Sequence, residues 1–121
     1  MPPADAKQDF PRRNRLKSSL LIHDIVTGGD TVFSHPIKCY YRRAPEGASE
    51  TSLAVVVPKR RFRHAVDRNR LKRLMREAYR THKFQDASLQ MCWIFVGKEM
   101  ASYEAVCHAV VRIHDKLKES L

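Results

Sequence analysis

Basic side chains are the chemically active groups that cluster most densely in this sequence. Its 121 residues contain 23 lysines and arginines against 13 acidic residues, which gives a net charge of +10 at neutral pH. Eleven of the basic residues lie between Lys59 and Lys83, where only Asp67 and Glu77 oppose them. Like charges at this density repel one another unless a polyanion relieves them, and clustered Lys and Arg attract the phosphates of nucleic acid. The segment therefore predicts a nucleic-acid-binding surface, although an acidic protein or a membrane surface would also attract it.

Side chains suited to catalysis show no comparable grouping. Nucleases that use Mg²⁺ hold it with clustered carboxylates, whereas the acidic residues here are scattered and the six histidines show no recurrent spacing. We interpret His64 and His82, which flank the basic segment, as solvated or phosphate-adjacent. Three cysteines without close spacing disfavour a disulfide scaffold and favour a reducing cytoplasm. We therefore expect no catalytic residue and no metal ligand in the protein itself.

A helix is expected to position the basic residues. From about Ala65 the apolar residues recur at helical spacing, so that one stripe of the helix faces a core. That apolar stripe contains Leu71, Leu74, Met75 and Ala78. The opposite stripe, which carries the cations, contains Asn69, Lys72, Arg73, Arg76 and Arg80. The helix therefore predicts a cationic face that points away from the core.

Two more helices and three strands are expected around it. The first helix is capped by Ser18 or Ser19 and ends at Gly28-Gly29, because glycine readily takes the left-handed conformation that ends helices. The last helix begins after Ser102. Pro36 lacks an N–H, so the first strand is expected to be an edge strand or to be bulged there. The three strands are expected over residues 32–43, 53–57 and 91–96.

These elements predict one α+β domain over residues 10–121, a two-layer sandwich in the order α-β-β-α-β-α with helices packed against one small sheet. Residues 1–9 are polar and contain prolines, so we expect a flexible N-terminal arm there. No apolar run reaches the length of a membrane-spanning helix.

The centre of the basic segment resembles a known motif. Residues Arg68-Asn69-Arg70-Leu71-Lys72-Arg73-Leu74-Met75-Arg76-Glu77 are similar to the R-N-R-x-K-R-x-x-R-E signature of the bacterial ribonuclease P protein subunit. Phe10-Pro11-Arg12 and Arg15-Leu16 are similar to the sequence with which members of that family begin. In the family a strand is followed by a basic pair, and here Lys59-Arg60 follows a predicted strand. The resemblance covers roughly residues 10–118.

The resemblance implies a division of labour between protein and RNA. In this family a large RNA subunit cleaves the phosphodiester bond with bound Mg²⁺, and the small basic protein binds that RNA and the 5′ leader of precursor tRNA. The chain would thus be the protein component of a ribonucleoprotein endoribonuclease that makes the mature 5′ end of tRNA. Mg²⁺ would be held mainly by RNA, and no membrane or DNA partner is expected. The family fold also implies a left-handed β-α-β crossover.

The resemblance and the cationic stripe together imply which residues contact RNA. The candidates for the surface that faces the RNA subunit are Lys59, Arg60, Arg68, Asn69, Arg70, Lys72, Arg73, Arg76 and Arg80. Arg70 lies off both stripes of the helix, so the alternative is that it packs against the first helix. A second basic group contains Arg12, Arg13 and Arg15.

A cleft for the single-stranded leader is the other site that the resemblance implies, floored by the sheet and walled by the first helix. Aromatic rings that stack on bases suit this task. Tyr40 matches an aromatic position on the first strand, and Phe33 is a second candidate. Ile22 and Val26 stand where relatives often carry two phenylalanines, so this wall would pack against the leader without stacking.

Other functions remain open on the sequence. A ribosome-associated or general RNA-binding module would bind RNA tightly without affecting tRNA processing. A protein-only nuclease would require clustered acidic residues. A helix-turn-helix DNA-binding regulator would require helices in place of the apolar strands.

Overall fold

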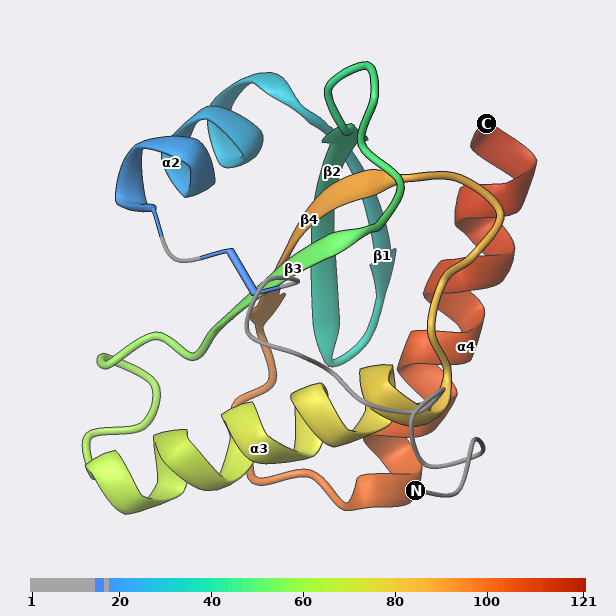
Figure 1. Ribbon diagram of the computed structural model, residues 1–121. Helices are drawn as coiled ribbons and strands as arrows, with labels where there is room; N and C mark the ends of the chain where they lie inside the picture. Colours follow the sequence, from blue (N-terminus) through green and yellow to red (C-terminus); the bar gives the residue numbers. More distant parts are fainter. Residues whose placement is uncertain (1–14, 17) are drawn as a thin grey trace, which may run out of the picture.

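The computed structural model describes residues 15–16 and 18–121 (Figure 1). The predicted arm at residues 1–9 and the predicted basic residues Arg12 and Arg13 lie outside this part of the chain. In the described part the helices are α2 (Ser19–Gly28), α3 (Ala65–Thr81) and α4 (Tyr103–Ser120), and the strands are β1 (Asp30–Ser34), β2 (Ile37–Arg43), β3 (Ser52–Val56) and β4 (Leu89–Phe95).

The strands form one sheet with the order β1-β2-β4-β3 within the described residues. β2 is antiparallel to both β1 and β4, whereas β3 is parallel to β4 and is joined to it through α3. β4 therefore lies inside the sheet, as its nearly continuous apolar sequence predicts. The α+β class is confirmed, and the left-handed course of the β3–α3–β4 connection stays a prediction.

The prediction of a single strand over residues 32–43 is wrong. The segment forms a hairpin in which β1 ends at Ser34 and β2 begins at Ile37, with Pro36 in the turn and a cis peptide bond before it. Pro36 has no N–H to give to a sheet ladder, so it separates two strands instead of bulging one. β2 is consequently an inner strand, β1 is an edge strand, and the order of the described elements is α-β-β-β-α-β-α.

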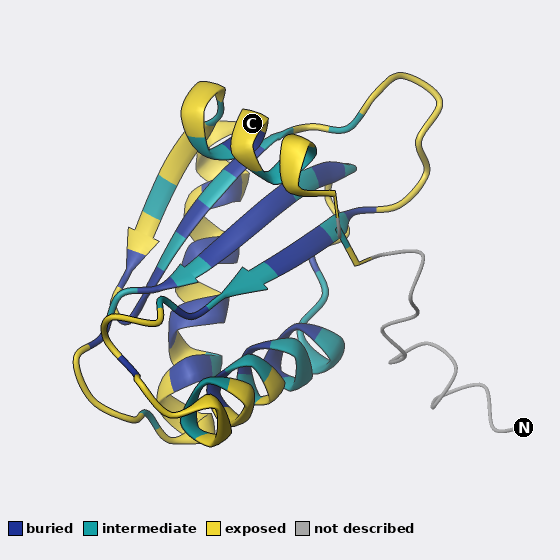
Figure 2. Ribbon diagram, turned by 90° about the vertical axis from the view of Figure 1, so that its left-hand side faces the viewer, coloured by how far each residue is buried: buried dark blue, intermediate teal, exposed yellow. Residues whose placement is uncertain are grey.

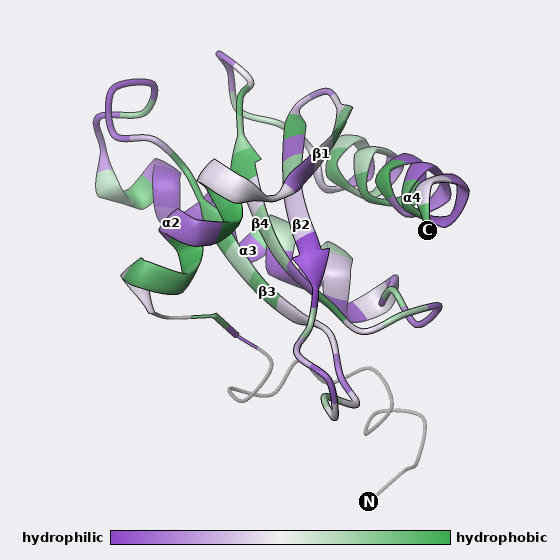
Figure 3. Cartoon of the chain, turned by 90° about the horizontal axis from the view of Figure 1, so that it is seen from above, coloured by the Kyte–Doolittle hydropathy of each residue, from purple (hydrophilic) through white to green (hydrophobic). Residues whose placement is uncertain are grey.

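The described helices begin and end close to the predicted residues. Ser18 caps α2 by accepting a hydrogen bond from the Leu21 backbone N–H at 3.4 Å, and Ser102 caps α4 through the Ala105 N–H at 3.1 Å. α2 lies on one face of the sheet, and α3 and α4 lie together on the other (Figures 1 and 3). None of these helices combines the length and apolar composition that crossing a membrane requires.

Gly29, at the end of α2, has a different role from the one expected. Its φ is −87°, in the extended region, so α2 does not end in a left-handed residue. A Cβ at this position would lie 2.6 Å from the backbone oxygens of both Ile25 and Tyr41. Glycine is needed because the end of α2 approaches β2 too closely for a side chain.

Two hydrophobic clusters hold the helices to the sheet. The larger cluster joins alternate residues of the strands to α3 and α4, and Trp93 and Phe95 are fully buried in it. The smaller cluster lies under α2, where Ile25 packs with Ala54 and Cys92. Buried positions run through the central strands and the inner sides of the helices, while the loops are mostly exposed (Figure 2). Both faces of the sheet therefore contribute to the core.

His114 on α4 lies inside the larger cluster although its side chain is ionisable. It is 8% exposed, and its ring centroid lies 5.4–6.2 Å from those of Tyr79, Phe84 and Trp93. No described residue forms a hydrogen bond with its Nε2 atom. Burial, with smaller contributions from nearby basic groups, lowers the pKa of His114 from 6.5 to about 4. The imidazole is therefore neutral in the folded protein near neutral pH.

This histidine should make the stability of the fold depend on pH. The unfolded chain takes up the proton near pH 6.5 and the folded protein only near pH 4, so the free energy of unfolding falls as pH drops through that interval. The slope approaches about 1.4 kcal/mol per pH unit. We expect urea denaturation between about pH 4.5 and 7.5 to show this loss in the wild type and a smaller one in His114→Leu. His108→Leu, at an exposed histidine of the same helix, should keep the wild-type dependence, and an unchanged dependence in His114→Leu would contradict the assignment.

Candidate nucleic-acid interface

The two stripes of α3 lie where they are predicted. The apolar stripe is buried or half-buried against the sheet and α4, and it contains Leu71, Leu74, Met75 and Ala78. The cationic stripe is exposed or half-exposed, and it contains Asn69, Lys72, Arg73, Arg76 and Arg80. Arg70 is exposed as well, and α2 packs on β2 and β4, so the alternative in which Arg70 packs against the first helix is wrong.

The loop between β3 and α3, residues 57–64, extends the cationic surface and is called the basic loop below. Its exposed cations are Lys59, Arg60, Arg61 and Arg63. Phe62 in the middle of the loop is buried in the larger cluster, with its ring 5.6 Å from that of Phe95. The backbone N–H groups of Arg61 and Phe62 both donate to the oxygen of Pro58, at 3.2 and 3.3 Å. The buried ring anchors the loop and leaves the neighbouring cations in solvent.

Arg68 holds the basic loop against the start of α3. Its Nη1 atom donates hydrogen bonds to the backbone oxygens of Phe62 and Arg63, both at 2.9 Å. The side chain is half-buried, and a hydrogen bond from a charged donor stabilises by about 1.5–3 kcal/mol. Arg68 therefore has a structural role in this surface, and its contact with RNA stays a prediction. The sequence contains no local signal for this role, because the contact depends on how the loop turns back toward the helix.

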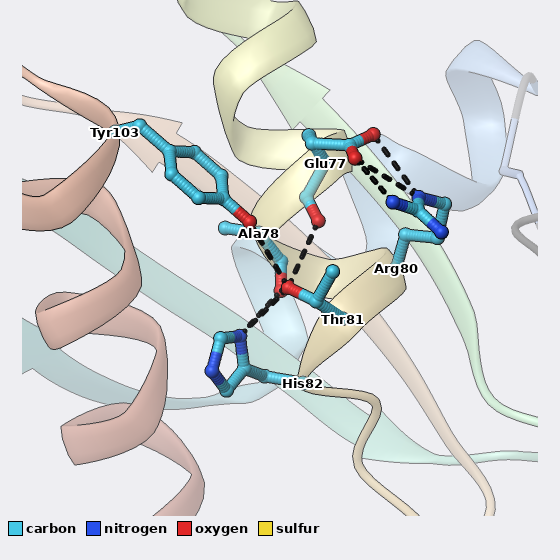
Figure 4. A network of polar contacts seen from close by, with 6 residues as sticks. All are labelled: Glu77, Ala78, Arg80, Thr81, His82 and Tyr103. Atoms are coloured by element: carbon cyan, nitrogen blue, oxygen red, sulfur yellow. Dashed lines mark hydrogen bonds and ion pairs between the residues drawn. The ribbon is translucent and has the colours of Figure 1, made fainter. Parts of the chain in front are cut away.

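Arg80 differs from the other cations of the stripe because it forms an ion pair within α3. Its Nη2 and Nε atoms lie 2.5 Å and 3.1 Å from Oε1 of Glu77 (Figure 4). Hydrogen bonding from Arg80 holds the pKa of Glu77 below its usual range, so this carboxylate stays charged opposite the guanidinium. Arg80 therefore adds less to the positive field of the helix than an isolated arginine would.

A second set of polar contacts joins the end of α3 to α4 (Figure 4). Thr81 Oγ1 lies 3.1 Å from the Tyr103 hydroxyl and 2.9 Å from His82 Nδ1, which is itself 3.1 Å from the Ala78 oxygen. His82 is thus half-buried and hydrogen-bonded at the helix terminus, so it is only partly solvated, and its position beside a phosphate stays a prediction. His64, at the other end of α3, is exposed as predicted.

Arg15 brings a cation from a distant part of the sequence to α3. The Leu16 backbone N–H donates to the Leu53 oxygen at 2.9 Å, and Arg15 forms a parallel bridge with Leu53. This segment therefore runs beside β3. Burial, and to a smaller extent the charge of Arg15, lowers the pKa of Arg76. The two guanidinium groups are thus within electrostatic reach of each other, so Arg15 belongs to the same cationic surface as the helix.

The opposite face of the sheet carries the predicted aromatic residue Tyr40 beside α2. Tyr40 is half-buried, and Nζ of Lys38 lies 5.0 Å from the centroid of its ring, a cation–π distance. The two side chains share a face because they are two residues apart on one strand. Lys38 is absent from the predicted site. The sequence does contain a signal for it, because Lys38 lies two residues before Tyr40 on the same predicted strand.

The other predicted residues of this face differ in exposure. Ile22 and Val26 are half-buried and pack with Tyr40 on the smaller cluster, so they form part of a core more than an open wall. Phe33 is 47% exposed and lies opposite Lys38 in the register of β1 and β2. We refer to Phe33, Lys38 and Tyr40 together as the sheet-face site.

Guanidinium, ammonium and aromatic groups determine what these surfaces bind. Arginine holds a phosphate through two parallel N–H bonds, lysine acts as a point charge, and aromatic rings stack on unpaired bases. Among residues 15–16 and 18–121, no three His, Cys, Asp or Glu side chains are grouped so as to hold a metal ion. The arrangement suits the binding of a nucleic-acid strand.

Arg73 and Arg68 should respond differently to substitution by alanine. Arg73→Ala removes an exposed charge, so binding to a structured RNA should weaken and the slope of log K against log salt should fall by about 1, with the melting temperature unchanged. Arg68→Ala also removes the loop hydrogen bonds, so the free energy of unfolding should fall by on the order of 2 kcal/mol. Fluorescence anisotropy over a salt series and urea denaturation measure the two effects. A stability loss in Arg73→Ala would contradict its assignment as a purely surface cation, and no loss in Arg68→Ala would contradict its structural role.

Comparisons with known proteins agree on one family. The model of the family described as Ribonuclease P matches residues 10–118 of this chain. A ribonuclease P protein component from Chlorobium phaeobacteroides is 30% identical, over 87% of this chain and 85% of its own length. A ribonuclease P protein component from Porphyromonas gingivalis is 44% identical over 63 residues, which cover 51% of this chain. The match covers 46% of that relative, so the chain spans about half of its length.

Solved structures of similar proteins share the fold. The RNase P protein of Staphylococcus aureus superposes with a TM-score of 0.76 at 21% identity, covering 87% of this chain and 95% of that one. The RNase P protein of Thermotoga maritima gives a TM-score of 0.70 at 22% identity, with 84% and 96% covered. The structures support the fold, and the family model and the Chlorobium relative support the assignment. On this evidence the chain belongs to the ribonuclease P protein family.

Proposed function

We propose that this chain is the protein subunit of ribonuclease P. It would bind the catalytic RNA subunit and the 5′ leader of precursor tRNA, and so promote the endonucleolytic removal of the leader that makes the mature 5′ end. The observation that carries the proposal is the concentration of exposed cations on one side of α3 and on the basic loop, in a chain of this family. The protein would supply binding and orientation, and the RNA subunit would carry out hydrolysis.

The cationic side of α3 is proposed to face the RNA subunit. Lys72, Arg73 and Arg76 extend from a helix whose other side is buried, so their backbone positions are set before RNA arrives. Arg15 and the basic loop widen the same surface. Cations that replace counterions on a phosphate backbone gain affinity from the release of those ions. A fixed cluster of this kind favours a structured RNA over a flexible anionic peptide.

The donor groups of this surface suit phosphate more than they suit Mg²⁺. Magnesium takes oxygen ligands from carboxylates, phosphates and water, whereas the surface presents guanidinium and ammonium groups. RNA phosphates would therefore hold the Mg²⁺ that supplies the hydrolytic chemistry. The contribution of the protein would be to reduce the repulsion between the backbone of the substrate and that of the RNA subunit.

The leader is proposed to lie on the sheet-face site beside α2. Tyr40 offers an aromatic ring, Lys38 places an ammonium group beside it, and Phe33 adds a second ring on the same face. Proteins that bind single-stranded RNA combine such stacking surfaces with nearby cations. The two binding surfaces are linked at one segment, because Leu16 packs on the cluster under α2 while the charge of the adjacent Arg15 helps to lower the pKa of Arg76.

Cleavage of precursor tRNA tests the proposal. A bacterial ribonuclease P RNA at low Mg²⁺ should cleave the substrate faster with the protein than without it, and the protein alone should be inactive. Arg73→Ala should require more protein for the same stimulation, whereas Arg112→Ala, at an exposed cation of α4, should not. Cleavage by the protein alone would contradict the division of labour. Tight RNA binding without stimulation would favour a general RNA-binding module.

Binding to the RNA subunit should also depend steeply on salt. Six to ten phosphate contacts predict roughly a 10³- to 10⁵-fold loss of affinity between about 50 and 200 mM salt. Equilibrium binding of labelled RNA over a salt series measures this slope. A flat response would mean that the cations of α3 and the basic loop lie outside the interface.

A further inference from the structure

A groove lies at the end of the sheet, next to the turn between β1 and β2. Its volume is about 790 Å³, within the roughly 300–1,000 Å³ that is typical of ligand sites. Its walls come from the β1–β2 hairpin, the basic loop, the connection between β4 and α4, and the first turn of α4. We call it the hairpin groove, and the residues that define it are Phe33, His35, Arg61, Lys98 and Met100.

Close backbone packing forms one side of the hairpin groove. Gly97 is buried, and a Cβ at this position would lie 2.9 Å from the ring of Phe95 and 3.1 Å from Cβ of Pro36. The Val96 backbone N–H donates to the Pro36 oxygen at 2.8 Å. The chain that follows β4 is thus held directly against the hairpin. Backbone packing therefore fixes this side of the groove.

Exposed apolar groups line the hairpin groove. Phe33 is 47% exposed and Met100 is 40% exposed. The ring of His35 approaches Phe33 edge-on, with the centroids 6.4 Å apart and an angle of 73° between the planes. An exposed aromatic ring with a flexible thioether nearby suits contact with a flat, partly apolar group such as a nucleobase.

Charge complementarity narrows the class of ligand. Arg61 and Lys98 are both exposed in the lining, and neither forms an ion pair with a described residue. Glu99 also contributes to the lining, so the cations exceed the acidic groups by one. A ligand that carries a flat base and a phosphate would match both the apolar and the cationic parts of this lining. A nucleotide has this combination.

The hairpin groove and the sheet-face site share Phe33. Phe33 lies opposite Lys38 in the strand register, and Lys38 lies over the ring of Tyr40, so these side chains form a row that leads toward the turn. Arg61, on the other wall, belongs to the basic loop. We propose that the hairpin groove holds a nucleotide of the single-stranded 5′ leader next to those at Tyr40, with its base against Phe33 and its phosphate near Arg61 or Lys98. This inference rests on the proposed function.

The test compares binding of precursor tRNA and mature tRNA to the reconstituted holoenzyme. Phe33→Ala and Phe33→Leu should each lower the preference for the leader-bearing substrate by about 5-fold or more, because stacking on one base contributes at least about that much. Phe33→Trp should keep the preference, and Lys98→Ala should lower it. Binding of mature tRNA should be unchanged in all four variants. The matched controls are Val111→Ala and Arg112→Ala, at an exposed apolar residue and an exposed cation of α4.

Crosslinking locates the nucleotide independently of affinity. Precursor tRNAs with 4-thiouridine at successive leader positions should give, at one position, a crosslinked peptide that contains Phe33 or Met100. The groove assignment alone would be overturned if the wild-type holoenzyme prefers precursor tRNA, the variants keep this preference, and no leader position crosslinks to the groove. Failure of the wild-type protein to stimulate cleavage would instead overturn the proposed function. If Phe33→Leu keeps the preference and Phe33→Ala loses it, Phe33 makes an apolar contact and does not stack on a base, which contradicts the proposal.

Discussion

Burial of the apolar stripe of α3 sets the direction of every cation on that helix. Leu71, Met75 and Ala78 are fully buried, and a large apolar side chain contributes about 1.5–3 kcal/mol when it is removed from water. Repulsion between exposed cations is weaker, because salt screens charges that are more than about 8–10 Å apart. The apolar contribution therefore decides how α3 lies on the sheet. It also holds together like charges that would move apart on an unfolded chain.

The same constraint organises the segments that join α3 on this surface. Phe62 is buried at the centre of the basic loop, and Arg68 bonds to the loop backbone, so the loop cations project from a fixed turn. Arg15 reaches the surface because its neighbour Leu16 pairs with β3 and packs under α2. In each case an apolar or backbone contact places a charged side chain. The positions of the charges that make this surface positive are thus set by the hydrophobic core.

Local signals in the sequence predicted the features that depend on local structure. The stripes of α3 and the serine caps of α2 and α4 are examples, since each involves residues within one or two turns. The hairpin was missed because a proline after Ser34-His35 is compatible with an edge or bulged strand as well as with a turn, and spacing does not distinguish them. The role of Arg68 depends on loop geometry, which spacing does not reveal. The ion pair between Glu77 and Arg80 could be predicted from their spacing of three residues on a helix. This pair reduces the contribution of Arg80 to the positive charge of the site.

The position of the sheet-face site follows from the short length of α2. A helix of 10 residues is about 15 Å long, whereas the seven residues of β2 extend about 23 Å. Through Ile25, α2 therefore covers Ala54 and Cys92 but leaves the end of β2 near Lys38 partly exposed. The same strand buries Cys39 and Tyr41 on its other face, so a shift of one residue in its register would exchange site and core. The core thus fixes which side chains face the open end of the sheet, and the exposed residues there can vary in sequence without changing the register that places them.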